Sequence, residues 1–292
     1  MRGSIKYQAN QIFLKLDGIG ISKKDNRDNS NIKAENGNNV SDKIHSFKSK
    51  KDFINRVKEI GEFVKENFNI KDMQEINNTH IEKYIESKIN KGLTYNTIST
   101  YLSQIYKLQL GLDRLDKKLD KHKNLFTRDK IKELRIKAKD ETKNNEHTNR
   151  AYHSLDTVEK LINNRSIISF KLQKNYGLRI SETTRILKKQ LKGDNVLTIT
   201  GKGGYTRDIV LKKELYNEIS EHIKTKGLFK VSNRTYENDL KIAIEKTNQE
   251  FNGSHGIRYS FAQLQKINGA SDSEISYLLG HHREEITQYY LK

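Results

Sequence analysis

The sequence has 292 residues and a formal net charge of +18, with 55 Lys and Arg against 37 Asp and Glu. This excess favours a polyanionic partner, most simply nucleic acid. The absence of cysteine excludes disulfides, thiolate metal sites and a cysteine nucleophile, and no run of 18 apolar residues predicts a membrane span or signal peptide. We therefore expect a soluble cytoplasmic, nucleoid-associated protein with no membrane partner.

A chain of this length has room for two domains, each with its own core. Residues 1–46 are expected to form an N-terminal segment that is partly a flexible arm. Ser22 to Lys43 hold almost no apolar side chains that could offset the entropy lost on ordering. Before them, Ile12 to Gly18 predict a short strand and turn.

Residues 47–140 predict a helical domain, because apolar side chains recur there at helical spacing. A fourth helix is expected at about 128–139, and residues 141–149 are polar, which is typical of a linker. The three apolar stretches are Phe53, Val57, Ile60, Phe63 and Val64; Ile81, Tyr84, Ile85 and Ile89; and Ile98, Tyr101, Leu102, Ile105 and Leu108.

Residues 150–292 predict a second domain, mostly α with a small antiparallel β-sheet. Helices are expected at 154–163 and 167–176, and the later part of the domain is also helical. Residues 196–200 and 208–211 flank Gly201-Lys202-Gly203-Gly204, which predicts a β-hairpin with a glycine-rich turn. This turn lacks the spacing of a nucleotide-binding loop and precedes no helix, so ATP binding is excluded.

Six polar residues, spread over the last 120 positions in a particular order, together predict a site for a phosphodiester. A guanidinium is permanently charged and can bond two phosphate oxygens, and a tyrosine can act as a nucleophile. These residues are Arg179 in Gly177-Leu178-Arg179, Lys202 in the glycine-rich turn, His255 and Arg258 in His255-Gly256-Ile257-Arg258, His281 after Leu278-Leu279-Gly280, and Tyr290 nine positions later.

Local signals predict how these side chains are presented. Ser254 is a good N-cap residue, so His255 and Arg258 should project from one face of a first helical turn, whose free amides favour an anion. Ser271 and Glu274 form the pattern of a capping box, and Gly280 is placed to end that helix. His281 should therefore emerge just past the helix end.

In order and spacing these motifs resemble the tyrosine site-specific recombinases and phage-type integrases over residues 150–290, and residues 92–102 resemble their core-binding domain. The resemblance implies a two-domain, C-shaped DNA clamp, with residues 47–140 as the core-binding domain and 150–292 as the catalytic domain. It also implies the site roles. Tyr290 attacks the phosphate, Arg179, Arg258, His255 and His281 bind it, Lys202 protonates the leaving 5′ oxygen, and Glu182 supports the site.

The resemblance further implies that no cofactor and no metal are needed. The partner is double-stranded DNA with a specific recombination site, bound by a homo-tetramer on two sites through a Holliday junction. Many relatives continue past the tyrosine into a helix that docks on a neighbouring subunit, whereas two residues follow Tyr290 here, so the mode of assembly stays open. The target sequence and the choice among integration, excision and dimer resolution stay open too.

Several alternatives remain at this point. Tyr289 is a second candidate nucleophile, and since adjacent helical residues point about 100° apart, only one of the pair can face the phosphate. The nine-residue step from His281 selects Tyr290, and the Leu-Leu-Gly-His phrase selects His281 over His282. A type IB topoisomerase would use the same chemistry, and a catalytically silent DNA-binding protein could keep the same fold.

Overall fold

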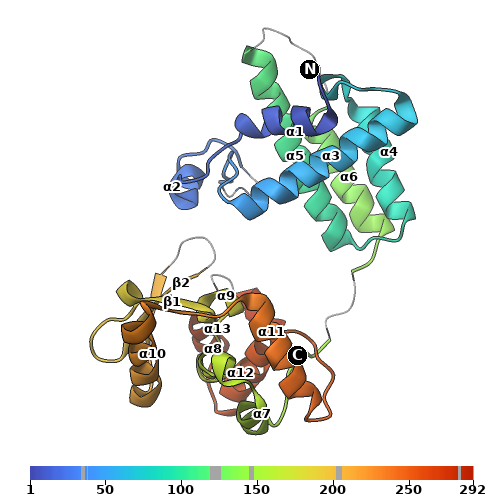
Figure 1. Cartoon of the computed structure of the whole chain (residues 1–292). Helices are drawn as coiled ribbons and strands as arrows, with labels where there is room; N and C mark the ends of the chain where they lie inside the picture. The colour runs from blue at the N-terminus through green and yellow to red at the C-terminus, as the bar shows by residue number, and fades with distance from the viewer. Residues whose placement is uncertain are drawn as a thin grey trace. The chain divides into compact units, whose positions relative to one another are not determined.

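The computed structural model of the protein describes residues 1–33, 37, 39–118, 126–144, 148–201, 206–281 and 284–291, without the side chains of 116–118 and 284. The chain divides into two compact units, Met1–Glu146 and His147–Lys292 (Figure 1). The division falls inside the predicted linker, residues 141–149. Each unit has a hydrophobic core of its own.

The first unit is helical. Its core takes one face from each of the helices that contain the three predicted apolar stretches, and residues such as Val57, Ile85 and Leu102 are fully buried. The helical periodicity of these stretches is thereby confirmed. The elements are α1 (Ile5–Leu14), α2 (Lys23–Asp28), α3 (Phe47–Phe68), the 3-10 turn η1 (Met73–Glu75), α4 (Asn78–Asn90), α5 (Tyr95–Lys118) and α6 (Arg128–Glu141).

The strand predicted at residues 12–18 is wrong, because residues 5–14 form helix α1. Ala9, Ile12, Phe13 and Leu16 are buried while Leu14 is exposed. These four buried residues have the i, i+3, i+4, i+7 spacing of one helix face, with Leu16 just past the end of α1. The helix packs on α3 and α5 (Figure 1). The alternation of Ile12, Leu14 and Leu16 had suggested a strand.

The described part of the segment 22–43, predicted as a flexible loop or arm, contains α2 and is tied to α5. The Arg114 guanidinium donates to the Asp42 carboxylate and, at 3.1 Å, to the Lys15 carbonyl oxygen. The ammonium of Lys107 donates to the Lys43 carbonyl oxygen at 3.2 Å. An ion pair and a hydrogen bond from α5 thus hold the end of this segment, which has few apolar side chains.

The second unit combines helices with two small antiparallel sheets, which pair β1 with β4 and β2 with β3 (Figure 1). The elements are α7 (Leu155–Leu161), α8 (Asn164–Tyr176), α9 (Ile180–Thr183), β1 (Arg185–Leu187), η2 (Lys188–Gln190), β2 (Val196–Thr200), β3 (Thr206–Val210), α10 (Lys213–Lys226), β4 (Leu228–Lys230), α11 (Asn233–Glu245), α12 (His255–Ile267), α13 (Asp272–Leu279) and α14 (Glu284–Gln288).

The predicted hairpin is confirmed as β2 and β3, in a register that places Ile199 opposite Arg207. The predicted capping box is present too. The Ser271 hydroxyl accepts from the Glu274 amide at 3.3 Å, and Gly280 ends α13 with φ of 63°. The β1–β4 pair was not predicted, since three-residue strands carry too short a pattern to recognise.

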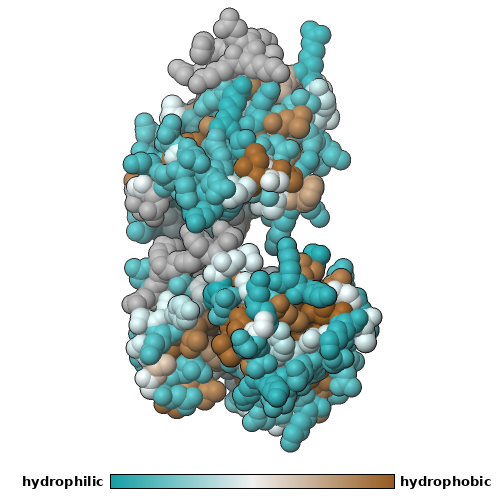
Figure 2. Space-filling view, turned by 90° about the vertical axis from the view of Figure 1, so that its left-hand side faces the viewer, coloured by the Kyte–Doolittle hydropathy of each residue, from teal (hydrophilic) through white to brown (hydrophobic). Residues whose placement is uncertain are grey.

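The surface fits the basic, polar composition. Hydrophilic side chains predominate on the viewed face of each unit, with hydrophobic patches among them (Figure 2). In the described parts of the chain, no helix combines the length and the apolar character that crossing a bilayer would require.

Candidate active site

Arg179 and Glu182 are brought together by the short helix α9, which begins directly after Arg179. The Glu182 carboxylate accepts from the Arg179 backbone amide and from its Nη1, each at 3.0 Å. Arg179 Nη2 also donates to the Gly280 carbonyl oxygen at 3.3 Å. The guanidinium is therefore held by α9 on one side and by the end of α13 on the other.

Arg207, a residue that the sequence analysis missed, binds the same carboxylate from strand β3. Its Nη2 lies 3.1 Å from Glu182 Oε2. A Cβ atom at Gly280 would lie 2.5 Å from Arg207 Nη1, so glycine leaves room for this guanidinium. Burial acts to raise the pKa of Glu182, but the Arg179 amide and the charges of Arg207 and Arg179 outweigh it and hold that pKa below its ordinary value.

Arg258 lies on the first turn of α12 and is fully buried. Its Nη2 donates to the Leu279 carbonyl oxygen at 2.9 Å and to His281 Nε2 at 3.1 Å, and its Nη1 donates to the Gly177 carbonyl oxygen. Burial, followed by the positive charge of Arg179, lowers the pKa of Arg258 to about 10. The side chain therefore keeps its charge at neutral pH.

Tyr290 points into this group of side chains and is 9% exposed. Its hydroxyl lies 3.3 Å from His255 Nδ1, and the Arg258 guanidinium carbon is 5.6 Å from the centre of its ring. Tyr289 is 42% exposed. Of the two adjacent tyrosines, Tyr290 is the one whose hydroxyl meets His255.

His255 has an exposed edge, but its Nδ1 faces Tyr290. The burial of part of the ring, followed by the charges of Arg258 and Arg179, holds the pKa of His255 below its ordinary value. His255 is therefore neutral at physiological pH. A neutral imidazole has one nitrogen free to accept a proton.

His281 lies just past the end of α13, as predicted, between Arg258 and the helix that precedes the tyrosine. Its Nδ1 is 2.9 Å from the hydroxyl of Thr287, a buried residue of α14 that the sequence analysis missed. Burial and the surrounding charges, Arg258 first, lower the pKa of His281 to about 3. Both rings beside Tyr290 are thus uncharged at neutral pH.

Ser254 does not cap α12 with its side chain, since it is already helical, at φ −62° and ψ −19°, and its hydroxyl donates to Glu237 at 3.0 Å. The prediction of a side-chain N-cap there is wrong. Lys202 and His282 lie outside the described residues, so their placement stays a prediction.

The assembled site has more donors than acceptors. The guanidiniums of Arg179 and Arg207 share the buried Glu182 carboxylate, and that of Arg258 is bound by backbone carbonyl oxygens and His281 among the described residues. The Nε groups of Arg207 and Arg258 are buried and reach no acceptor in those parts of the chain. Buried donors without acceptors are costly, and an excess of cationic donors favours an anionic ligand. No group of three or more His, Asp or Glu that could hold a metal was found among these residues.

The chain matches known protein families. Residues 142–292, just over half of the chain, match the phage integrase family, and residues 39–110 match the family described as phage integrase, N-terminal. This chain belongs to the phage integrase family. A curated relative, tyrosine recombinase XerC of Caldanaerobacter subterraneus subsp. tengcongensis, is 29% identical in a 164-residue alignment that covers 48% of this chain. The match spans 46% of that relative, just under half of its length.

Solved structures of recombinases and integrases share the fold of this protein. XerH site-specific recombinase bound to palindromic difH substrate has a TM-score of 0.63 at 15% identity, covering 98% of this chain and 91% of that one. The Tn1549 transposon integrase in complex with transposon right end DNA has a TM-score of 0.57 at 14% identity, covering 99% and 95%. The predicted fold class, mostly α with a small antiparallel sheet, is confirmed.

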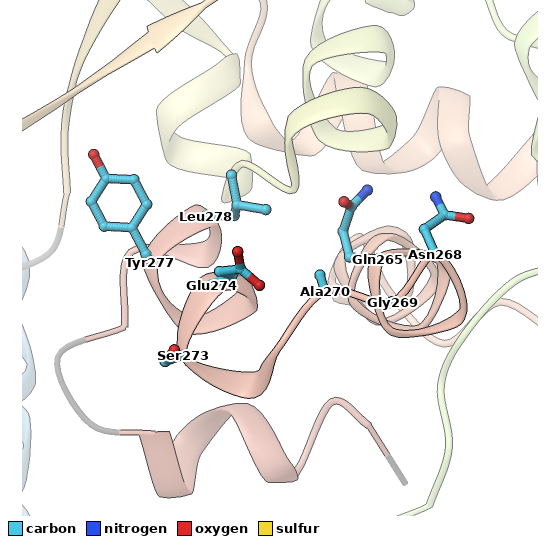
Figure 3. Close-up of a pocket in the computed structure, with 8 residues that line it drawn as sticks. All are labelled: Gln265, Asn268, Gly269, Ala270, Ser273, Glu274, Tyr277 and Leu278. Atoms are coloured by element: carbon cyan, nitrogen blue, oxygen red, sulfur yellow. The ribbon is translucent and has the colours of Figure 1, made fainter.

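A surface pocket of about 690 Å³ lies in the second unit, between the end of α12 and α13 (Figure 3). Its lining includes Gln265, Glu274 and Leu278 but none of the guanidiniums or imidazoles described above. The Glu274 carboxylate is engaged by the Ser271 amide and hydroxyl, each at 2.7 Å. The pocket is therefore separate from the candidate active site.

Glu182→Gln should destabilise the second unit, because the two arginines lose the charge between them. We expect the free energy of unfolding at pH 7 to fall by about 1–3 kcal/mol. The pKa of Glu182 is lower in the folded state than its ordinary value of 4.5. The ionised carboxylate therefore stabilises the fold fully above pH 4.5, and this stabilisation is lost as the pH falls through the folded-state pKa of Glu182.

Urea unfolding at pH 7 and at successively lower pH measures this effect. The gap between the wild type and Glu182→Gln should narrow below pH 4.5. Glu221→Gln is the matched control, because Glu221 forms an exposed pair with Lys224 and should change stability by less than about 0.5 kcal/mol. A gap that stays constant down to acid pH would contradict this role of the Glu182 charge.

Proposed function

We propose that this protein is a site-specific DNA recombinase that cuts and rejoins strands through a covalent bond between Tyr290 and a DNA 3′ phosphate. The observation that carries the proposal is the placement of the Tyr290 hydroxyl, 3.3 Å from His255 Nδ1 and beneath the Arg258 guanidinium. A buried tyrosine among cationic donors has the chemistry of a nucleophile for a phosphodiester.

In the proposed cleavage step, the Tyr290 oxygen attacks phosphorus and the bond from phosphorus to the 5′ oxygen breaks. Negative charge builds on the non-bridging oxygens, where Arg179 and Arg258 would bind it with charge-assisted hydrogen bonds. Arg258 is rigidly held by two backbone carbonyl oxygens. A donor that is already oriented needs little rearrangement during the reaction.

The step also requires two proton transfers. The Tyr290 proton would pass to His255, whose lowered pKa keeps it neutral and able to accept. The leaving 5′ oxygen would take a proton from Lys202, a role that rests on the resemblance of its turn to the family, since Lys202 lies outside the described residues. The general acid and the general base would thus be different residues.

Rejoining would reverse this chemistry, with a 5′ hydroxyl of a partner duplex attacking the phosphotyrosine. Each phosphoester bond that breaks is replaced by a new one, so the proposed reaction needs neither ATP nor a metal ion. We further propose a homo-tetramer on two recombination sites, a Holliday junction intermediate, and residues 47–140 as a core-binding domain that closes on DNA. The role would be that of a mobile-element or dimer-resolving recombinase at the cytoplasmic nucleoid.

The test is to mix the protein, in excess chelator, with nicked suicide duplexes made from fragmented host DNA and then to denature the mixture. We expect protein joined to DNA 3′ ends, with the adduct mapping to Tyr290. Sequencing the attached DNA would identify the site. Supercoiled plasmid lacking that site should remain supercoiled.

Other outcomes would reject the proposal. Tight DNA binding without an adduct would indicate a catalytically silent DNA-binding protein. Relaxation of plasmids with no preferred sequence and no junction products would indicate a topoisomerase-like enzyme.

A further inference from the structure

Thr287 touches both the imidazole of His281 and the segment that carries the tyrosine. It is fully buried, and its hydroxyl oxygen lies 2.9 Å from His281 Nδ1. Its backbone oxygen accepts from the Tyr290 amide at 2.8 Å. One residue therefore connects the ring beside Arg258 to the turn that ends in the nucleophile.

The partners of His281 determine which ring nitrogen carries the proton. Arg258 Nη2 lies 3.1 Å from His281 Nε2, and a guanidinium only donates, so Nε2 must accept. The proton of the neutral ring then sits on Nδ1, which donates to the Thr287 hydroxyl oxygen. A hydroxyl fits this position because its oxygen accepts while its own proton rotates elsewhere.

We propose that Thr287 is a positioning residue that fixes His281 as the Nδ1–H tautomer and fastens the Tyr290 segment to the site. The inference rests on the proposed function only for its kinetic consequence. The tautomer itself is a property of the protein without DNA.

The groups around His281 leave no other described acceptor for its Nδ1 proton. Arg258, Arg179 and Arg207 are all donors, and their charges disfavour a second proton on the ring. His255 is engaged through its own Nδ1 with Tyr290. Without the Thr287 hydroxyl, the ring would lose its fixed orientation, because a buried donor without an acceptor is costly.

Thr287→Val and Thr287→Ser separate the hydroxyl from the shape of the side chain. Valine keeps the volume and branching of threonine but has no oxygen, whereas serine keeps the oxygen. The full chain, labelled with ¹⁵N-histidine and free of DNA, is studied by two-bond ¹H–¹⁵N correlation. His281→Gln assigns the resonances of His281.

The wild type and Thr287→Ser should show His281 protonated at Nδ1 and not at Nε2. Thr287→Val should show a mixture of tautomers, because the Nδ1 proton loses its acceptor and the ring is no longer held with Nε2 against Arg258. Cleavage of a suicide substrate should be about 10- to 100-fold slower in Thr287→Val, within about threefold of wild type in Thr287→Ser, and DNA affinity should be unchanged in both.

An Nε2–H tautomer in the wild type would overturn the proposal, and so would an unchanged tautomer and cleavage rate in Thr287→Val. If Thr287→Val fails to fold, the proposal is still tested by the tautomer of the wild type and by the tautomer and cleavage rate of Thr287→Ser. If the wild type forms no DNA adduct, the recombinase proposal fails, while the tautomer readout continues to test Thr287.

Discussion

Tyr290→Phe is expected to reduce covalent DNA adduct formation below detection while changing DNA affinity by less than about twofold. The substitution removes one hydroxyl and keeps the ring that packs against Tyr259, with ring centres 4.5 Å apart, and beneath Arg258. Without the oxygen no phosphotyrosine bond can form. Denaturing gels of suicide-substrate reactions measure the adduct, and electrophoretic mobility shifts measure binding.

Tyr289→Phe is the matched control, since it removes a hydroxyl from the adjacent, more exposed tyrosine. It should form the adduct at a rate within about threefold of wild type. If Tyr290→Phe still cleaves while Tyr289→Phe does not, the nucleophile is Tyr289 and the assignment of Tyr290 is wrong.

Arg179→Ala is expected to slow cleavage by at least about 10²–10³-fold, the effect of losing one preorganised donor at a reacting anion. Arg179→Lys should recover only part of the rate, because an ammonium keeps the charge but lacks the planar fork that bonds two oxygens. Single-turnover cleavage at saturating DNA separates this effect from weaker binding.

Arg185→Ala controls for the general loss of positive charge. Arg185 is exposed on β1 and is six residues from Arg179, so its removal should weaken DNA binding modestly and leave the cleavage rate unchanged. Equal cleavage rates for Arg179→Ala and the wild type would remove Arg179 from the proposed chemistry.

Much of the fold could be predicted because its signals are local. The helices of the first unit follow the spacing of residues such as Val57 and Leu102, and the capping box at Ser271 is complete within four residues. The order of Arg179, His255, Arg258, His281 and Tyr290 predicted a site, and the structure brings these side chains together.

The features that were missed depend on contacts between distant segments. Arg207 is recognised as part of the site only by its contact with Glu182, 25 residues away in sequence. Thr287 is recognised only by its contact with the ring of His281. Ser254 reads as an N-cap, but a tertiary contact with Glu237 takes its hydroxyl. The first helix was mistaken for a strand because its short apolar run fits both periods.

The pairing of Arg207 with Glu182 also limits which insertions and deletions the β2–β3 hairpin can accept. Exposure alternates along β3, with Arg207 and Ile209 facing the protein and Asp208 facing outward, where it accepts from Thr198 at 2.6 Å. A slip of one residue would replace Arg207 with Thr206 or Asp208, and an inward Asp208 would face the Glu182 carboxylate. Length changes near Lys202 would therefore have to be absorbed between Thr200 and Thr206, so we expect relatives to differ in length in this stretch and not in β2 or β3.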